Sequence, residues 1–200
     1  HMADPHIVKK LVEGREDDIR PCVGANYCID RFYIRGQARC LHNPAMGRER
    51  EIPQIFSPAP VRRRIVIAGG GPGGLETARV AAQRGHDVVL FEKADRLGGQ
   101  VNLAARAPRH EALADVIAWL ERQVRKLGVD IRLGVEANAA NILAETPDVV
   151  IVATGGTPGD AGVKGAEHAI SGWDMLSGAR EPSGTVLIYD DNGEHQAPMY

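Results

Sequence analysis

Residues 64–76 read Arg-Ile-Val-Ile-Ala-Gly-Gly-Gly-Pro-Gly-Gly-Leu-Glu, and this stretch decides the fold. The apolar run predicts a buried strand, and the glycine-rich turn after it leads into a helix. Gly69 permits a tight turn, Gly71 lets the backbone approach a pyrophosphate, and Gly74 lets the helix pack on the strand. The helix N-terminus then points at the phosphate charge. The residues predicted to cradle a dinucleotide are Gly69, Gly70, Gly71, Pro72, Gly73 and Gly74.

A carboxylate follows the next predicted strand. The run Val88-Val89-Leu90-Phe91 ends in Glu92, about 20 residues beyond the glycines, where a carboxylate accepts hydrogen bonds from ribose hydroxyls. Because Glu92 repels a ribose 2′-phosphate, the site favours FAD, NAD or ADP over NADP. Lys93 is read either as a charge that softens this exclusion or as a solvated residue at the strand end.

Strands and helices alternate along the rest of this region. A helix is expected over 73–84, a strand over 87–92, and an amphipathic helix along the apolar positions from Leu113 to Leu127, ending at Gly128. Further strands are expected over 129–136 and 148–152. The sequence therefore predicts an α/β fold, a Rossmann-like parallel sheet with helices on both faces.

The composition of the chain excludes several classes of protein. The chain has 200 residues, 44% of them hydrophobic, and a formal charge of −2, so it has no basic surface that would indicate nucleic-acid binding. No apolar run is long enough to span a membrane and no secretory signal opens the sequence, which predicts a cytoplasmic location. Three cysteines within the first forty residues do not make a disulfide framework, so a metal or cluster site has to be considered.

The pattern divides the chain into four parts. Residues 1–2 resemble a tag remnant, and 3–60 form a short helix followed by a loop-rich cysteine segment and a proline-punctuated linker. Residues 61–182 form the dinucleotide-binding domain. Residues 183–200 begin a second nucleotide-binding domain, with a strand at Thr185–Tyr189 and a turn at Asp190-Asp191-Asn192-Gly193. Because no helix follows that turn, we expect the chain to be a fragment of a longer protein.

The cysteine segment carries a specific resemblance. Cys22 and Cys28 lie in Arg-Pro-Cys-Val-Gly-Ala-Asn-Tyr-Cys, and Cys40 lies in Ala-Arg-Cys-Leu-His-Asn-Pro. With the glycine turn, they resemble the [4Fe-4S] loop and adenine-nucleotide domain of the trimethylamine dehydrogenase and 2,4-dienoyl-CoA reductase family. The N-terminal half of that family is an FMN-binding TIM barrel related to old yellow enzyme. The wording of the loop is most similar to N-methylproline demethylases and histamine dehydrogenase-like members.

Two further stretches resemble flavoproteins of this kind. Leu97-Gly98-Gly99-Gln100 is similar to their second glycine turn, and Asp148–Gly156 is similar to their strand ending in Ala-Thr-Gly. Val135 is expected to meet an adenine edge through its backbone. The additional residues that this implies at the cofactor are Gly99, Gln100, Val135, Ala153, Thr154 and Gly155.

The loop departs from the family at one position, because Ala25 stands where the family has its second cysteine. The ligands that match are Cys22, Cys28 and Cys40. Three thiolates could hold a [3Fe-4S] centre or a [4Fe-4S] centre completed by another group. They could also bind zinc with His42 as the fourth ligand, or remain free thiols.

The resemblance implies the nucleotide-binding and electron-transfer portion of a flavin-dependent oxidoreductase. The expected substrate is a small N-methylated amine, bound with FMN in a barrel outside this sequence, so no catalytic residue is named here. FAD or ADP is the expected cofactor of this part, and an electron-acceptor protein and further copies of the full-length chain are the expected partners. The alternatives are an NADPH-dependent enoyl-CoA reductase, an ADP-binding scaffold without redox chemistry, and a small electron-transfer subunit like that of glutamate synthase.

Overall fold

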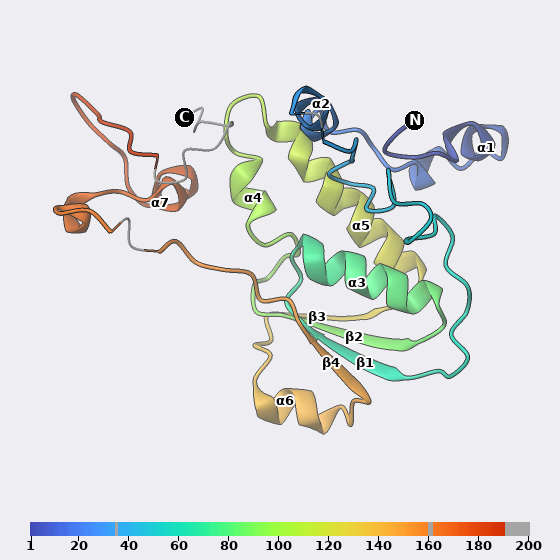
Figure 1. Cartoon of the computed structure of the whole chain (residues 1–200). Helices are drawn as coiled ribbons and strands as arrows, with labels where there is room; N and C mark the ends of the chain where they lie inside the picture. Colours follow the sequence, from blue (N-terminus) through green and yellow to red (C-terminus); the bar gives the residue numbers. More distant parts are fainter. Residues whose placement is uncertain (35, 160–161, 191–200) are drawn as a thin grey trace.

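The computed structural model describes residues 1–34, 36–159 and 162–190. Its centre is a four-stranded, fully parallel sheet in the order β3-β2-β1-β4 (Figure 1). The strands are β1 (Arg64–Ala68), β2 (Asp87–Glu92), β3 (Asp130–Leu133) and β4 (Val149–Val152). The helices are α1 (Ile7–Val12), α2 (Tyr27–Tyr33), α3 (Pro72–Gln83), α4 (Val101–Ala104), α5 (Ala114–Lys126), α6 (Ala139–Ala144) and α7 (Gly172–Ser177). Short 3₁₀ turns cover Glu16–Asp18, Glu111–Leu113 and Ala166–His168.

The side chains of β1 point alternately to the two faces of the sheet, and a hydrophobic core lies on each face. Ile65 and Ile67 face α3 and α5, where they join Leu75, Leu120 and other buried residues. Val66 faces the opposite side and packs with Val89 and Phe91 beneath α6. Successive side chains of a strand point to opposite faces, so the continuous apolar run is buried twice. The predicted sheet with helices on both faces is confirmed.

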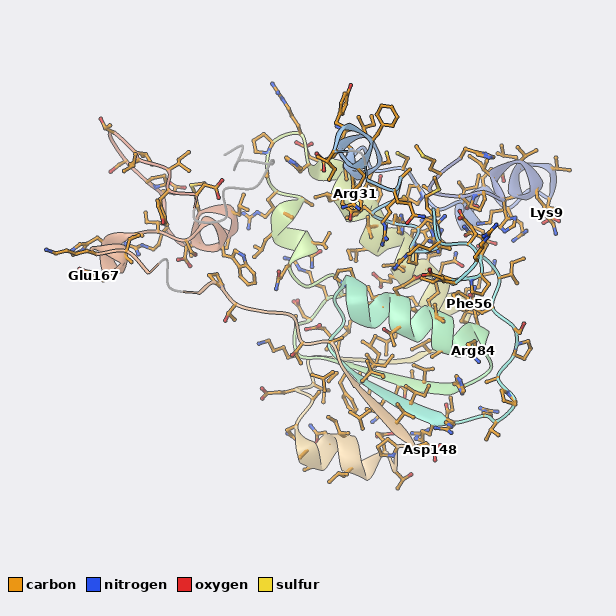
Figure 2. The ribbon with its side chains drawn as sticks, in the orientation of Figure 1. Lys9, Arg31, Phe56, Arg84, Asp148 and Glu167 are labelled. Carbon is orange, nitrogen blue, oxygen red and sulfur yellow. The ribbon has the colours of Figure 1, made fainter. Side chains whose placement is uncertain are left out.

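Ion pairs join the amino ends of neighbouring strands of the sheet. The Arg64 guanidinium contacts Asp87 at 2.5 Å and also pairs with Glu145, while the Arg64 backbone N–H donates to Asp148 at 2.7 Å. Asp148 and Arg84, at the end of α3, both lie at this edge, far from the glycine turn (Figure 2). The glycine turn lies at the opposite edge of the sheet, at the carboxyl ends of the strands.

Three expectations about strands are wrong. The strand expected over 129–136 ends at Leu133, because Gly134 adopts φ +69° and turns the chain. β4 is buried on one face alone: Val149 and Ile151 pack with the core on the α3 and α5 side, whereas Val152 points to the other face, where the described core includes no residue of β4, and is 73% exposed. Residues 185–189 form no strand, since no described segment pairs with them, and Leu187 is 93% exposed. The turn expected at 190–193 lies beyond the described residues after Asp190.

The cysteine segment contains a helix that the sequence did not predict. α2 carries Cys28 and follows Asn26, which adopts a left-handed φ of +53°. None of its residues is buried, and Phe32 and Tyr33 are largely exposed. A short helix without a buried face leaves no apolar periodicity to recognise. Among the described residues, no helix has the length and apolar character needed to cross a membrane.

Candidate functional site

The glycine turn after β1 cannot carry side chains at its two ends. Gly69 adopts φ +108°, and a Cβ there would lie 2.3 Å from the carbonyl oxygen of Ala153. A Cβ on Gly74 would lie 1.9 Å from the carbonyl oxygen of Gly69. The tight turn and the close packing of α3 on β1 expected from the sequence are therefore confirmed.

The middle of the turn is open. A Cβ built on Gly71 or Gly73 would meet no atom within 4 Å, so these two glycines are not required by contacts inside the protein. Gly71 has φ −73°, which any residue can adopt. The first N–H groups of α3 have no partner within their own helix and carry the positive end of its dipole. Space and unpaired N–H groups together fit a pyrophosphate.

Glu92 is buried at the end of β2 and turns towards the glycine turn. Its Oε2 accepts from the backbone N–H of Gly70 at 2.7 Å, and its Oε1 accepts from the N–H of Ala94 at 2.8 Å. Each oxygen retains acceptor capacity for a ribose hydroxyl. Lys93 is exposed beside it.

The second glycine turn packs on the first. The N–H of Gly98 donates to the carbonyl oxygen of Gly70 at 2.9 Å, and a Cβ on Gly99 would lie 3.2 Å from the Cα of Gly71. The side-chain amide of Gln100 donates to the carbonyl oxygen of Gly156 at 2.8 Å. Gln100 thus bridges to the segment that follows β4, beside Gly155, which has φ +75°.

These segments meet at one edge of the sheet. Ala153 follows β4 and its N–H donates to Ala68 at 2.8 Å, while the Thr154 backbone approaches Gly69. In the sheet, β2 lies on one side of β1 and β4 lies on the other. The strand order therefore reverses at β1, and the turns lie at this topological switch point. Open parallel sheets bind nucleotides at the carboxyl edge of such a point.

Val135, the residue predicted to contact the adenine, has few groups left to make that contact. Its backbone N–H already donates to the carbonyl oxygen of Glu92 at 3.1 Å, and its side chain packs near Val66 and Phe91. Its carbonyl oxygen is the backbone group left to meet an adenine amine. Gly98 and Gly156 also belong to the arrangement; both lie in the two stretches that resemble flavoproteins, but neither was among the residues expected at the cofactor.

The three cysteines line one small pocket of about 40 Å³ with Ala25 and His42. All three thiols are free, and Cys22 is exposed. No three His, Cys, Asp or Glu side chains of the described residues lie close enough together to bind a single metal ion, so the zinc arrangement with His42 is not formed. Three thiols around one hollow fit a cluster, whose iron atoms keep its sulfur ligands apart.

His42 is the buried polar residue of this pocket. Its Nδ1 lies 3.2 Å from the carbonyl oxygen of Pro21, and its ring meets Trp119 edge to face at 5.1 Å. Its Nε2 is buried without a hydrogen-bond partner. Burial lowers the pKa of His42 to about 4, which keeps the imidazole neutral near pH 7.

Trp119 joins the cysteine segment to the sheet domain. Its indole N–H donates to the carbonyl oxygen of Asp18 at 3.1 Å, and the Arg20 guanidinium stacks 4.6 Å from its ring. Arg20 in turn donates to the carbonyl oxygen of His42 at 2.6 Å. Trp119 is 4% exposed and therefore acts as a packing residue of this joint.

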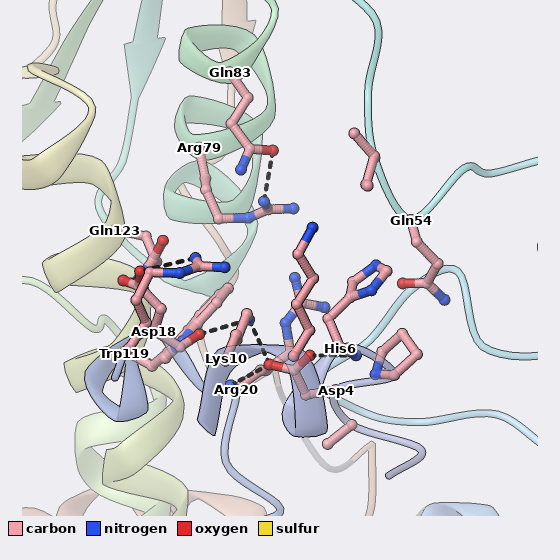
Figure 3. A pocket seen from close by; sticks show the side chains of 15 residues that line it. Asp4, His6, Lys10, Asp18, Arg20, Gln54, Arg79, Gln83, Trp119 and Gln123 are labelled. Carbon is pink, nitrogen blue, oxygen red and sulfur yellow. Dashed lines mark hydrogen bonds and ion pairs between the residues drawn. The ribbon is translucent and has the colours of Figure 1, made fainter. Parts of the chain in front are cut away.

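A larger cavity of about 290 Å³ lies between α1, α3 and α5, away from the glycine turns (Figure 3). Its polar side chains are engaged with one another: Lys10 contacts Asp4 at 2.5 Å, and the Arg79 guanidinium donates to the side-chain oxygen of Gln83 at 2.8 Å. Asp4 also accepts from the backbone N–H of Arg20 at 2.8 Å. The cavity belongs to the joint between the amino-terminal segment and the sheet domain.

Comparison with known proteins identifies a family. The family model described as "Pyridine nucleotide-disulphide oxidoreductase" matches residues 38–149 and 63–184. The chain is 52% identical, over 98% of its length, to a Rhizobium meliloti (strain 1021) protein named "Probable N-methylproline demethylase". It is 46% identical, over 95% of its length, to an N,N-dimethylglycine/sarcosine dehydrogenase of Chromohalobacter salexigens. It spans about 29% of the length of these curated relatives.

Solved structures agree with these matches. A 2-naphthoyl-CoA reductase complex superposes with a TM-score of 0.82 at 37% identity, covering 90% of this chain and 28% of the other. Histamine dehydrogenase from Rhizobium sp. 4-9 gives a TM-score of 0.81 at 28% identity, with coverage of 90% and 28%. The resemblance to the trimethylamine dehydrogenase and old yellow enzyme-like family is confirmed by these relatives.

Proposed function

Because the chain belongs to the pyridine nucleotide-disulphide oxidoreductase family, we propose that it is the nucleotide-binding and electron-transfer part of a flavin-dependent enzyme that oxidises a small N-methylated amine. The observation that carries the proposal is the meeting of two glycine turns, Glu92 and the segment after β4 at the carboxyl edge of the sheet. The N-methylated amines named in several relatives supply the substrate class.

Each part of the site has a role towards FAD or ADP. The N–H groups of Gly71, Gly73 and Gly74 hold the pyrophosphate at the start of α3, where Pro72 has no N–H to donate. Glu92 binds the ribose hydroxyls while keeping the turn in place through Gly70. Gln100 and Gly155 lie on the far side of the turn, where the flavin end of FAD would extend. When bound, the flavin supplies electron transfer, and the protein contributes binding and orientation.

The cysteine segment is proposed to hold an iron–sulfur centre. Support comes from Cys22, Cys28 and Cys40, which are free and line one hollow. Residues 3–60 then form the connection and cluster segment, 61–182 the nucleotide domain, and 183–200 the start of a second nucleotide-binding domain. The amine and its FMN would be bound by a part of the enzyme outside these 200 residues.

The first experiment is the anaerobic visible spectrum of the freshly purified chain, followed by identification of any nucleotide released on denaturation. Flavin bands with FAD in the supernatant would support a redox domain, and a broad added shoulder would support the cluster. A colourless protein that releases ADP would contradict the redox role and favour a structural nucleotide site. A protein that neither contains nor binds FAD or ADP would overturn the proposal.

A second candidate, reduction of an enoyl-CoA ester, is favoured by the likeness to 2-naphthoyl-CoA reductase. The two candidates share the nucleotide site and differ in the direction of electron flow. The full-length enzyme separates them, because an amine oxidase would reduce its flavin with N-methylproline or dimethylglycine alone. An enoyl-CoA reductase would need a reduced nicotinamide nucleotide and would consume the unsaturated ester.

A further inference from the structure

The cysteine pocket has one ligand fewer than a cluster normally uses. Iron–sulfur clusters of this type are held by four protein ligands, and here Cys22, Cys28 and Cys40 supply three. Ala25 lines the same pocket but has no donor atom. A fourth protein ligand has to come from another side chain of the pocket or be absent.

His42 lines that pocket and has an unused donor nitrogen. Its side chain is 6% exposed, and Nε2 has no hydrogen-bond partner. Nδ1 faces the carbonyl oxygen of Pro21 at 3.2 Å, which favours the tautomer with its proton on Nδ1. Nε2 then carries a free lone pair. Metal-binding histidines have this arrangement, in which one ring nitrogen donates to a backbone carbonyl and the other binds the metal.

Packing accounts for only part of this arrangement. The edge-to-face contact with Trp119 at 5.1 Å explains why the ring is buried. It does not explain a buried nitrogen without a partner, which is unfavourable unless something else satisfies it. An iron atom bound in the pocket that His42 lines would satisfy it.

We infer that His42 provides, through Nε2, the fourth protein ligand of a [4Fe-4S] cluster whose other ligands are Cys22, Cys28 and Cys40. This inference rests on the proposed function, since it requires that the segment holds a cluster. A neutral imidazole in place of a thiolate removes one negative charge from the cluster environment. The reduction potential is therefore higher than in a variant with four cysteines, as it is where histidine replaces cysteine in other iron–sulfur proteins.

The test is anaerobic reconstitution of the whole chain, labelled with ¹⁵N-histidine, using ferrous iron and sulfide. The native chain is expected to bind about four iron atoms and four sulfides. After reduction with dithionite, pulsed electron paramagnetic resonance should detect a histidine ¹⁵N coupled to the cluster. This readout needs no substitution and no enzymatic activity.

Substitutions provide the second readout. In His42→Ala and His42→Gln the iron without a protein ligand is lost on mild ferricyanide oxidation. In that step [4Fe-4S]²⁺ gives [3Fe-4S]⁺ and Fe²⁺, and one electron passes to ferricyanide. The oxidised [3Fe-4S]⁺ product has a paramagnetic signal that [4Fe-4S]²⁺ lacks. His110→Ala is the matched control, because the Nδ1 of His110 also faces a backbone carbonyl, that of Pro108 at 3.1 Å, but lies outside the pocket.

The double variant Ala25→Cys/His42→Ala tests whether loss of the iron in His42→Ala comes from misfolding, because it restores a fourth ligand without restoring His42. It should regain a stable four-iron cluster without nitrogen coupling and with a lower reduction potential than the native chain. A native cluster without histidine coupling, or the same three-iron centre in native and His42→Ala protein, would overturn the inference and leave the cluster proposal standing. A native chain that binds no iron after reconstitution would overturn both.

Discussion

The carboxylate of Glu92 accepts a hydrogen bond from the backbone N–H of Gly70 over 2.7 Å, and so ties the end of β2 to the turn after β1. Its second oxygen accepts from the N–H of Ala94 at 2.8 Å. A glutamate read from the sequence as a ribose ligand therefore also fixes the shape of the turn that receives the pyrophosphate. Binding of the ribose and order in the glycine turn depend on the same side chain.

Glu92→Gln tests that double role. Two backbone N–H groups face the two carboxylate oxygens, so a glutamine must turn its own NH₂ group towards one of them. We expect ADP affinity to fall about tenfold or more and stability to fall by about 1.5–3 kcal/mol, the range for a hydrogen bond to a charged group. Calorimetric titration and urea unfolding measure the two effects. Lys93→Ala, at the exposed neighbour, is the control, and unchanged ADP affinity in Glu92→Gln would remove the ribose role.

The glycines of the first turn should separate binding from folding. Gly74→Ala puts a Cβ 1.9 Å from the carbonyl oxygen of Gly69, which forces α3 away from β1 and should destabilise the fold by about 3 kcal/mol. Gly71→Ala meets no protein atom and should change stability by less than about 1 kcal/mol. Its methyl group would occupy space beside the pyrophosphate, so nucleotide affinity should drop. Normal nucleotide affinity in folded Gly71→Ala protein would contradict the proposed cradle.

The joint between the amino-terminal segment and α5 should depend on pH. The Lys126 ammonium donates to both oxygens of Asp18, at 2.7 and 2.9 Å, and lowers the pKa of Asp18 to about 2. Since this is below the unfolded value of about 3.9, the stabilisation is complete above about pH 4 and is lost as the pH falls towards 2. Because the Lys126 side chain is 60% exposed and the pair is screened by solvent, this contribution amounts to about 1 kcal/mol.

Asp18→Asn should remove most of that stabilisation near neutral pH. The difference in unfolding free energy between native and variant protein should then shrink as the pH is lowered from about 4, which urea titrations at several pH values would measure. Asp17→Asn, at the exposed neighbour, is the matched control. A difference that stays constant across this range would show that Asp18 acts through packing rather than charge.

The glycine turn could be predicted because its constraints are local. Gly69 is required by its own φ of +108° and Gly74 by the packing of α3 on the turn after β1, and Glu92 follows the next strand at a typical spacing. The contact of Gly98 with Gly70 and the bridge from Gln100 to Gly156 join segments far apart in the chain. No local pattern encodes such contacts, so only resemblance pointed to this region.

The sequence predicted the edge strand of the sheet and the exposed helix α2 less well. The apolar sequence of β4 predicts burial on both faces, but Val152 is exposed because the described core on its face does not include β4. The apolar run at 185–189 forms no strand because no described segment pairs with it, and a strand needs a partner as well as a propensity. α2 exposes Phe32 and Tyr33, so its apolar residues do not form the buried stripe that marks a helix.

Gln100→Ala should distinguish the two ends of the cofactor. Gln100 bridges to Gly156 at 2.8 Å on the side of the turn where the flavin of FAD would lie, whereas Glu92 serves the adenosine end. Loss of one hydrogen bond from the Gln100 amide to the flavin end would be worth about 1 kcal/mol, so FAD affinity should fall about fivefold while ADP affinity stays unchanged. Because the bond is exposed, stability should change by less than about 0.5 kcal/mol. Titrating both nucleotides into native, Gln100→Ala and Glu92→Gln protein measures this. If Gln100→Ala weakened FAD and ADP equally, its effect would be on the shape of the turn, and the assignment of the flavin side would be wrong.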